Sequence, residues 1–258
     1  MLSARAIYHE ICDNDDTYAL FLSVAAAGES QGGWENERIA HLTSDPELSG
    51  KIARHGKDEE KHGRVFHALL RKRGLDPIEV PPEAHYTRLL EQAGIGLSHP
   101  RLKQERLLSD EEIIVYLVHS RVTEQRAAEE VAMQCRVFGD DPELGNAIRI
   151  IAADEVNHLA YCHEELLRFC QRGHEPLIRR LLRRYAQAEV RTYRDVSQAV
   201  MGEMGRKLRW SAPKRALLGF GIRAIYAFER SLGWRRLTRL RMPTRRNAMG
   251  SKTAAAAA

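Results

Sequence analysis

The sequence predicts an all-α fold in which a four-helix bundle is followed by additional C-terminal helices. The chain has 258 residues and 43% hydrophobic content, and its 18 glycines and 9 prolines are few for that length. This composition disfavours disorder and a turn-rich β fold. Long segments are bounded by helix-capping residues. A stretch of sequence also repeats with an offset of 96 residues, as expected when one helical hairpin is used twice.

The first half predicts two long helices joined by a short turn. Asp13-Asn-Asp-Asp16 offers N-capping side chains for a helix over residues 17–41. Thr43-Ser-Asp-Pro46 interrupts that helix, and Pro46 suits the first turn of the next one. The second helix is expected to reach about residue 72 and to stop at Gly74, because glycine favours helix C-termini.

The second half predicts a matching pair of helices and then two more. A proline-containing loop over 75–82 and short helical pieces over 83–106 lead to it. Ser109-Asp-Glu-Glu112 is a capping sequence for a helix through Phe138. Gly139-Asp-Asp-Pro142 breaks the pattern again, and the fourth helix is expected to end near Gly173. Two further helices are predicted over about 175–208 and 213–240.

Charge divides the chain into an acidic body and a basic extension. Residues 171–258 hold 21 Lys and Arg against 5 Asp and Glu, a net charge of +16, whereas the first 170 residues hold 19 against 30, a net charge of −11. We therefore predict a helical bundle over 14–173, a basic helical extension over 174–246 and a disordered tail over 247–258.

The cysteines and the N-terminus favour a cytoplasmic protein. Cys12, Cys135, Cys162 and Cys170 never form a C-x-x-C pair, which argues against a zinc ribbon or a rubredoxin-type iron site. The first 16 residues lack a signal-peptide pattern, and no stretch approaches about 18 uninterrupted apolar residues. We expect the chain to be cytoplasmic, either free or peripheral to the inner face of the membrane.

Each repeat carries a Glu-x-x-His motif, and each motif has a glutamate thirty or thirty-one residues upstream. Positions i and i+3 share a helix face, so each motif directs a carboxylate and an imidazole the same way. Buried carboxylates need a charged partner, and mixed carboxylate and imidazole ligands without thiolate suit iron or manganese. We therefore predict a dinuclear metal site, a known arrangement in helix bundles. Its predicted ligands are Glu29, Glu59, His62, Glu124, Glu155 and His158.

The motifs resemble those of a known superfamily. Ala27-Gly-Glu-Ser-Gln31 resembles the first metal-helix motif of rubrerythrin-like members of the ferritin-like superfamily, and Asp58-Glu-Glu-Lys-His-Gly63 is similar to their second-helix motif. The likeness covers about residues 14–173. It implies an up-down four-helix bundle that binds two iron ions. It also implies that Glu59 and Glu155 bridge the irons, with Glu29 and His62 completing one iron and Glu124 and His158 the other.

One departure from the family points to a branch of it. Rubrerythrin peroxidases usually carry another glutamate one turn after the first ligand of the second half, where this chain has Ala127 and Ala128. The rubredoxin module is missing too. The resemblance thus implies the oxygen-activating branch, which includes aldehyde-deformylating oxygenases and a tRNA hydroxylase. We expect a non-haem di-iron oxidoreductase that uses dioxygen and an external electron donor to oxidise or hydroxylate a hydrophobic, lipid-like substrate.

Other functions fit the same ligands. A ferroxidase or iron-handling protein needs no organic substrate. Assembly into a cage would favour that function, whereas a monomer or homodimer with an apolar pocket would favour the oxygenase. A rubrerythrin-like peroxidase and an RNA-modifying hydroxylase also remain as alternatives. The hydroxylase would require the basic extension to bind the phosphates of the RNA.

Several neighbours of the motifs have two interpretations. Asp58 and Asp154 either orient the ligand histidines or face solvent. For Tyr161, core packing is favoured over a position facing the metals. Small residues at 32–33 and 127–128 either leave room for a substrate or permit close helix packing. Four further carboxylates are expected at the surface: Glu35, Glu37, Glu129 and Glu130.

The basic extension contains an amphipathic segment over 214–240. Apolar side chains recur there at helical spacing, and Arg215, Arg223 and Arg230 follow another face. Three interpretations remain open: a helix packed on the bundle, a helix lying on an anionic membrane surface, and a polyanion-binding segment. RNA is the least favoured, since no RNA-binding motif is visible. The apolar residues are Leu217, Leu218, Phe220, Ile222, Ile225, Phe228, Leu232 and Trp234.

Overall fold

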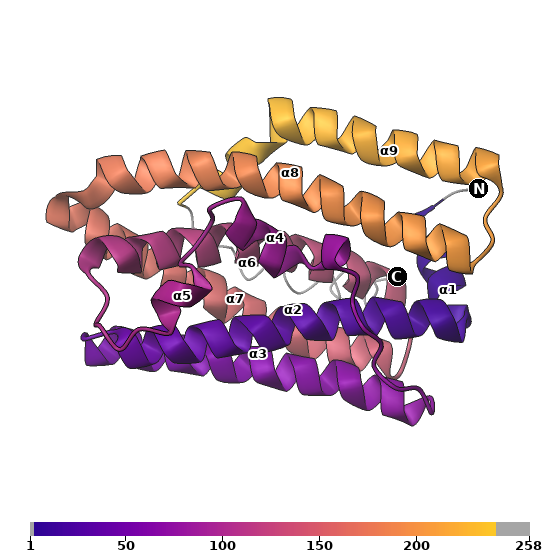
Figure 1. Cartoon of the computed structure of the whole chain (residues 1–258), viewed down its shortest axis with the longest axis horizontal. Helices are drawn as coiled ribbons and strands as arrows, with labels where there is room; N and C mark the ends of the chain where they lie inside the picture. The colour runs from indigo at the N-terminus through magenta and orange to yellow at the C-terminus, as the bar shows by residue number, and fades with distance from the viewer. Residues whose placement is uncertain (1–2, 241–258) are drawn as a thin grey trace, which may run out of the picture.

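The computed structural model describes residues 3–240, and all regular structure in this range is helical (Figure 1). Nine α-helices and no strand occur in the described part, which confirms the predicted all-α class. None of these helices is long and apolar enough to cross a membrane. The predicted disordered tail over 247–258, and the six residues before it, lie outside the described residues.

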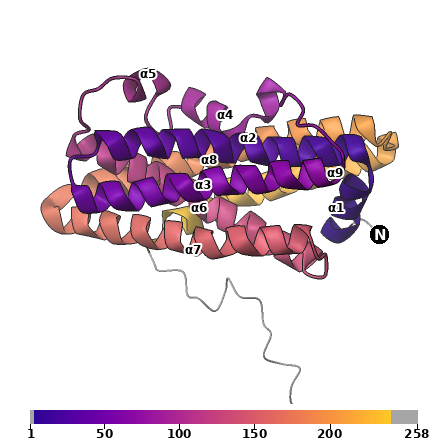
Figure 2. The same cartoon turned by 90° about the horizontal axis from the view of Figure 1, so that it is seen from below.

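Two helical hairpins form the body of the molecule (Figure 2). The first pairs α2 (Asp15–Leu42) with α3 (Pro46–Lys72), and the second pairs α6 (Asp110–Phe138) with α7 (Leu144–Phe169). The predicted boundaries of these helices lie close to the observed ones, although α7 ends before Gly173. A short helix that the sequence reading did not include, α1 (Ala4–Asp13), precedes them.

The repeated Asp-Pro-Glu-Leu sequence begins the second helix of each hairpin in the same way. The Asp45 side chain accepts hydrogen bonds from the backbone N–H groups of Glu47 and Leu48. The Asp141 side chain does the same for Glu143 and Leu144. Each aspartate thereby satisfies N–H groups that a helix start leaves without partners. The sequence repeat is thus also a structural repeat.

A long crossover sets the direction of the second hairpin. It includes a 3-10 turn (Pro82–Ala84), α4 (Tyr86–Gln92) and α5 (His99–Leu102). The Leu108 N–H donates to the Leu42 carbonyl at 2.9 Å, so α6 begins at the end of the bundle where α2 stops. Helix α6 therefore runs parallel to α3 (Figure 1). The predicted up-down order of the four helices is therefore wrong at one point. The helices within each hairpin are antiparallel, but α3 and α6, which the crossover joins, run in the same direction.

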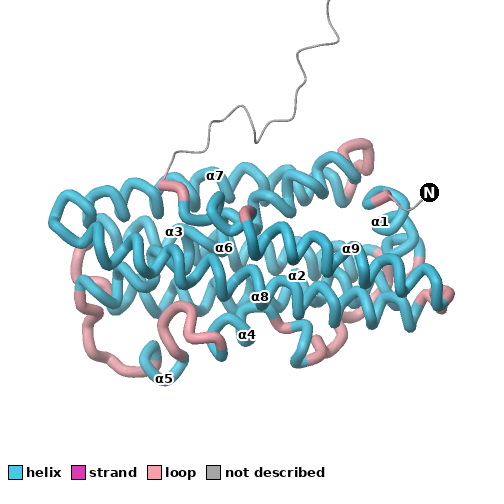
Figure 3. Tube along the Cα trace, turned by 90° about the horizontal axis from the view of Figure 1, so that it is seen from above, coloured by secondary structure: helices cyan, strands magenta, loops and turns pink. Residues whose placement is uncertain are grey.

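The C-terminal extension shares the core of the bundle. A π-helical turn (Cys170–His174) with Gly173 at φ 93° joins α7 to α8 (Glu175–Lys207). The buried side chains Ile178, Leu181 and Leu182 of α8 belong to the same hydrophobic core as residues of α2 and α6. Helix α9 (Ala212–Ser231) then folds back along the second half of α8, and a 3-10 segment (Gly233–Thr238) follows. Figures 1 and 3 show α8 and α9 on one side of the two hairpins.

Candidate metal centre

The two Glu-x-x-His motifs and the two upstream glutamates meet between the hairpins. Each hairpin contributes three residues: α2 and α3 carry Glu29, Glu59 and His62, and α6 and α7 carry Glu124, Glu155 and His158. All except Glu29 are buried, and Glu29 is partly exposed. The short turn inside each hairpin places the middle of one helix beside the middle of the next, which brings residues thirty positions apart to the same level.

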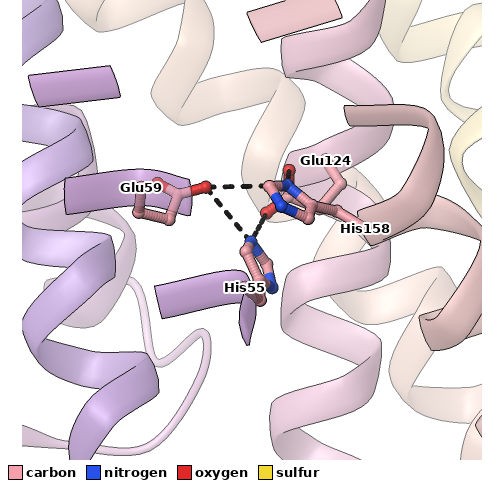
Figure 4. Close-up of side chains that lie close together, drawn as sticks. All are labelled: His55, Glu59, Glu124 and His158. Atoms are coloured by element: carbon pink, nitrogen blue, oxygen red, sulfur yellow. Dashed lines mark hydrogen bonds and ion pairs between the residues drawn. The ribbon is translucent and has the colours of Figure 1, made fainter. Parts of the chain in front are cut away.

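One group of four buried side chains could hold a metal ion (Figure 4). It consists of His55, Glu59, Glu124 and His158, whose ligand atoms all lie within 4.8 Å of one another. The Nε2 atom of His55 is 3.1 Å from a Glu59 oxygen and 3.3 Å from a Glu124 oxygen. Figure 4 shows Glu59 approaching from one side and Glu124 with His158 from the other.

A second group of ligand atoms adjoins the first. It contains Glu29, Glu59 and His62, and the Nδ1 atom of His62 is 3.1 Å from a Glu29 oxygen. Glu59 thus belongs to both groups, which is the place of a carboxylate shared between two ions. The sixth predicted residue, Glu155, lies beside the first group, with one oxygen 3.9 Å from Nδ1 of His158.

Two ligand atoms at this centre are buried without a hydrogen-bond partner: Oε2 of Glu155 and Nδ1 of His158. The His158 nitrogen lies 3.8–3.9 Å from oxygens of Glu59, Glu124 and Glu155, too far for hydrogen bonds. Buried polar atoms normally find partners. Ligand bonds of about 2 Å would let one cation contact this nitrogen and the oxygens together. The residues therefore fit a bound metal ion.

Burial raises the pKa values of three carboxyl groups at the centre. It raises those of Glu29 and Glu59 to about 7 and that of Glu155 well above its usual range, and neighbouring carboxylates add to the effect for Glu59 and Glu155. A cation bound among these side chains would favour their charged forms and displace the protons.

Glu124 and the two imidazoles of its group stabilise one another as ions. Burial opposes the charge of Glu124, but the positive charge of His55 and the nearby imidazole of His158 hold its pKa well below the usual range. Burial likewise opposes the charge of both histidines, and Glu124 outweighs it, raising the pKa values of His55 and His158 to about 9. The group thus attracts positive charge.

The ligand histidines are oriented by aspartates of the opposite repeat. Nε2 of His62 is 2.9 Å from Asp154, and Nε2 of His158 is 3.4 Å from Asp58. Lys61 contacts both aspartates, at 2.8 Å and 2.6 Å. These contacts leave Nδ1 of each imidazole directed at the carboxylates. Of the two sequence interpretations of Asp58 and Asp154, the structure thus favours orientation of the histidines, and it adds that the contacts cross between the hairpins.

His55 is a functional candidate that the sequence analysis missed. It lies one turn before Glu59 on the same face of α3, but the corresponding position of the second repeat is Ile151, so the repeat gave no reason to select it. The i−4 spacing from Glu59 was the available signal.

A chain of buried hydrogen bonds fixes the proton position on His55. The Tyr116 hydroxyl donates to Asn36 at 2.6 Å, so the Tyr161 hydroxyl, 2.6 Å away, donates to Tyr116. Nδ1–H of His55 then donates to Tyr161 at 2.7 Å. When a bound cation displaces the Nε2 proton, the lone pair of Nε2 would face the space between Glu59 and Glu124. Tyr161 is buried as expected, and it also supports a candidate ligand.

A cavity of about 310 Å³ borders the centre. Its walls include small and apolar residues of the bundle, Gly28 and Ala127 among them, together with Tyr86 of α4 and Tyr193 and Val196 of α8. His119 also lines it, and burial lowers the pKa of that imidazole to about 4, so the side chain is uncharged at neutral pH.

The small residues near the centre divide into two kinds. A Cβ atom on Gly32 would lie 2.8 Å from a Glu59 oxygen, and one on Gly33 would lie 3.3 Å from the Gly56 carbonyl oxygen. These two glycines therefore permit close approach. A Cβ on Gly28 would meet nothing within 4 Å, and Ala127 lines the cavity. Both interpretations of the small residues hold, each at different positions.

Two carboxylates expected at the surface instead line the cavity. Glu130 accepts a hydrogen bond from the Tyr193 hydroxyl, and Glu35 accepts one from the Gln31 amide at 2.7 Å. The expectation of surface positions was wrong for these two because α4, α5 and α8 cover that side of the bundle. Glu37 is exposed, and the partly buried Glu129 pairs with Arg236 at 2.9 Å.

A buried ion pair closes the wall of the cavity. Arg126 of α6 donates two hydrogen bonds to the Glu189 carboxylate of α8, at 2.7 Å and 2.9 Å, and Tyr86 of α4 donates to the same group at 3.0 Å. Paired, hydrogen-bonded charges are tolerated in the interior, and the planar guanidinium fixes their geometry. Three separate segments are thereby joined behind the cavity.

A scan against protein-family models, a search of curated proteins and a search of solved structures found no match to this chain.

Proposed function

We propose that this protein is a non-haem di-iron oxidoreductase of the ferritin-like type, which uses dioxygen to oxidise or hydroxylate an apolar substrate held in the cavity beside the metal centre. The observation that carries the proposal is the set of four glutamates and three histidines, all buried except Glu29, of which the glutamates and His55 line this cavity. A set of ligands next to space for a substrate is the arrangement that such a reaction needs.

The arrangement of the ligand atoms supports two ions rather than one. Glu29 and His62 lie on one side of Glu59, and Glu124 and His158 lie on the other. Glu155, with a buried unpartnered oxygen, would be the second carboxylate shared by the two ions. Oxygen and nitrogen donors without thiolate favour iron, with manganese as the alternative. The single long crossover between the hairpins is also the connection found in ferritin-like folds.

The chain's own residues have three tasks in this mechanism. The four carboxylates would balance the charge of two bound ions and keep them in place. Asp58, Asp154 and Tyr161 orient the imidazoles. The cavity walls exclude water and position a C–H bond of the substrate near the centre.

The iron pair, when bound, supplies the redox chemistry of dioxygen. In a hydroxylation, one oxygen atom enters the substrate and the other becomes water. This balance requires two electrons from an external donor and two protons.

The cavity favours this function over a ferroxidase or iron-handling role. Oxidation of Fe(II) by itself requires no space for an organic molecule, whereas about 310 Å³ lined by Gly28, Ala127 and Val196 accommodates one. A rubrerythrin-like peroxidase is disfavoured because Ala127 and Ala128 follow Glu124 where that family's additional glutamate is expected.

Metal binding tests the centre directly. After anaerobic loading with Fe(II), we expect two irons per chain and rapid oxygen consumption. Glu155→Gln should bind fewer than two irons and consume oxygen slowly, because a bridging carboxylate is lost. Glu164→Gln is a matched control, since Glu164 is an exposed residue of the same helix. Wild-type protein that binds no stoichiometric iron, or a Glu155→Gln variant that matches Glu164→Gln, would contradict the proposal.

A second variant separates substrate oxidation from iron oxidation. Ala127→Leu adds bulk to the cavity wall without replacing a ligand, so Fe(II) binding and oxidation should persist while oxidation of an apolar substrate falls at least about tenfold. Ala128→Leu, which lies outside the cavity lining, should keep both activities. Fatty aldehydes and fatty acids of graded length are suitable first substrates, with product oxygen traced from labelled dioxygen. Iron oxidation without any labelled product across that series would favour the ferroxidase.

A further inference from the structure

Helix α9 is apolar on two opposite sides. Its inner side packs on the molecule through Leu218 and Tyr226, each of which contacts a different hydrophobic cluster of the core. On its outer side, large hydrophobic residues are 54–65% exposed. They are Leu217, Phe220, Ile225, Phe228 and Leu232, the last lying just beyond the helix. A helix that only packed on the bundle would need one apolar side. Packing on the bundle therefore explains the inner side of α9 but not the outer one.

The outer residues form one continuous stripe. They are three to five positions apart over four turns, and Ala224 lies among them, so they share one face of the helix. Of the nine large hydrophobic residues that are exposed in the described part of the chain, five belong to this stripe. Such a concentration marks an interaction surface rather than the scattered exposure of a normal protein surface.

The charges around the stripe are positive. Arg223 and Arg230 are exposed at one border of it. The one acidic residue between 212 and 240, Glu229, is buried and paired with Arg236 at 2.5 Å, so it does not reduce the surface charge. Helix α8, which lies on the same side of the hairpins as α9 (Figures 1 and 3), carries a groove lined by five arginines and Gln187.

We infer that the outer face of α9 docks on an anionic phospholipid surface. An apolar stripe with large aromatic residues, bordered by arginines, is suited to lie in the membrane interface with its side chains among the acyl chains. The arginines would contact the lipid phosphates, and the row on α8 would add long-range attraction. This inference does not depend on the metal centre or on the proposed reaction.

Other occupants fit the surface less well. A second copy of the chain would bring two arginine borders together around a two-fold axis, and no exposed carboxylate of α9 would neutralise them. A nucleic acid would use the arginines but would leave the apolar stripe exposed to water. A lipid surface satisfies both the charge and the stripe.

Vesicle binding of the full chain tests the inference. We expect co-sedimentation with vesicles that contain phosphatidylglycerol and much weaker binding to pure phosphatidylcholine. Phe220→Ser with Phe228→Ser should weaken binding at least about tenfold, because two phenylalanine side chains that enter the membrane on binding are removed. Ile150→Ser with Leu167→Ser is the matched control, since both residues are exposed hydrophobic residues of α7. Arg223→Glu with Arg230→Glu should remove the preference for anionic lipid.

Three results would overturn the inference. One is wild-type protein that does not bind anionic vesicles. Another is equal binding by the Phe220→Ser/Phe228→Ser variant and its α7 control. The third is a concentration-dependent dimer, or an RNA complex, that the same substitutions abolish while vesicle binding is undetectable. Phe220 and Phe228 are 65% and 58% exposed, so their substitution leaves the fold intact, which thermal unfolding of each variant verifies.

Discussion

Gly32 sets the distance between α2 and the carboxylate of Glu59. A methyl group at this position would lie 2.8 Å from Oε2 of Glu59, so the carboxylate would have to leave its present position in the two ligand groups. We predict that Gly32→Ala weakens metal binding at least about tenfold, as displacement of a ligand does. The metal-free protein should lose no stability, since alanine favours helices by about 1 kcal/mol over glycine. Metal titration and thermal unfolding measure the two effects.

Gly28 provides the matched control for this substitution. It lies one turn earlier on α2, and an added Cβ would meet nothing within 4 Å. Gly28→Ala should therefore keep the metal affinity and gain the same helical stabilisation. If both variants bound metal like the wild type, the close contact between Gly32 and Glu59 would have no role in shaping the centre.

The individual residues of the centre were predictable only where the sequence repeats. Spacing and duplication selected six positions, and the structure places all six together. His55 has no counterpart at Ile151 and so escaped notice, although it lies 3.1 Å from Glu59. Glu130 was expected at the surface because unpaired charges are rarely buried. Its partner Tyr193 belongs to the distant helix α8, so the sequence around Glu130 contains no sign of the hydrogen bond between them.

The start of α6 is held by a cluster of local interactions around Glu112. Its side chain accepts a hydrogen bond from the Ser109 N–H at 2.9 Å and one from Arg101 at 2.5 Å. The Arg101 hydrogen bond is the main reason that the pKa of this carboxyl falls to about 2. We predict that Glu112→Ala lowers the free energy of unfolding by about 1–2 kcal/mol, the range for a capping residue with a charged partner.

The pH dependence of this effect has a definite sign. A carboxyl whose pKa is lower in the folded state stabilises the protein above its unfolded pKa, near 4.5, and loses this contribution as pH falls towards 2. The difference in stability between wild type and Glu112→Ala should therefore shrink over that interval in chemical denaturation. Glu111→Ala is the control, because Glu111 is exposed in the same turn. Equal destabilisation by both variants would assign the effect to helix charge alone.

The long helices were predictable as elements because their ends carry strong local signals. Asn14, Asp45 and Ser109 cap α2, α3 and α6 as their side chains suggest. The direction of α6 was not predictable, because it depends on where the crossover of residues 73–109 packs. That packing involves contacts with α2 and α8, far away in the sequence, and no capping residue encodes it.

At the scale of the whole molecule, metal binding should stabilise the fold as well as the centre. The ligands come from α2, α3, α6 and α7, so an ion bound among them connects both hairpins. We predict that the midpoint of thermal unfolding rises on loading with Fe(II) or Mn(II). At one hundred times the dissociation constant, the gain is about 2.7 kcal/mol for each site.

Calorimetry with and without a chelator measures this stabilisation. The Glu155→Gln variant should gain less than wild type from the same metal concentration, and Glu164→Gln should gain as much. If the unfolding midpoint of the wild type did not change on addition of metal, the ions would either bind the unfolded chain equally well or not bind the centre at all.

The crossed contacts between histidines and aspartates have a consequence for the symmetry of the protein. His62 pairs with Asp154 and His158 with Asp58, which is the reciprocal pattern that a two-fold axis generates between identical partners. The chain is thus the fused equivalent of an isologous dimer of one hairpin. Fusion permits what identical partners cannot have: one half carries His55 where the other carries Ile151. The two sides of the centre are therefore chemically inequivalent, and a molecule that enters the centre meets different side chains on each side.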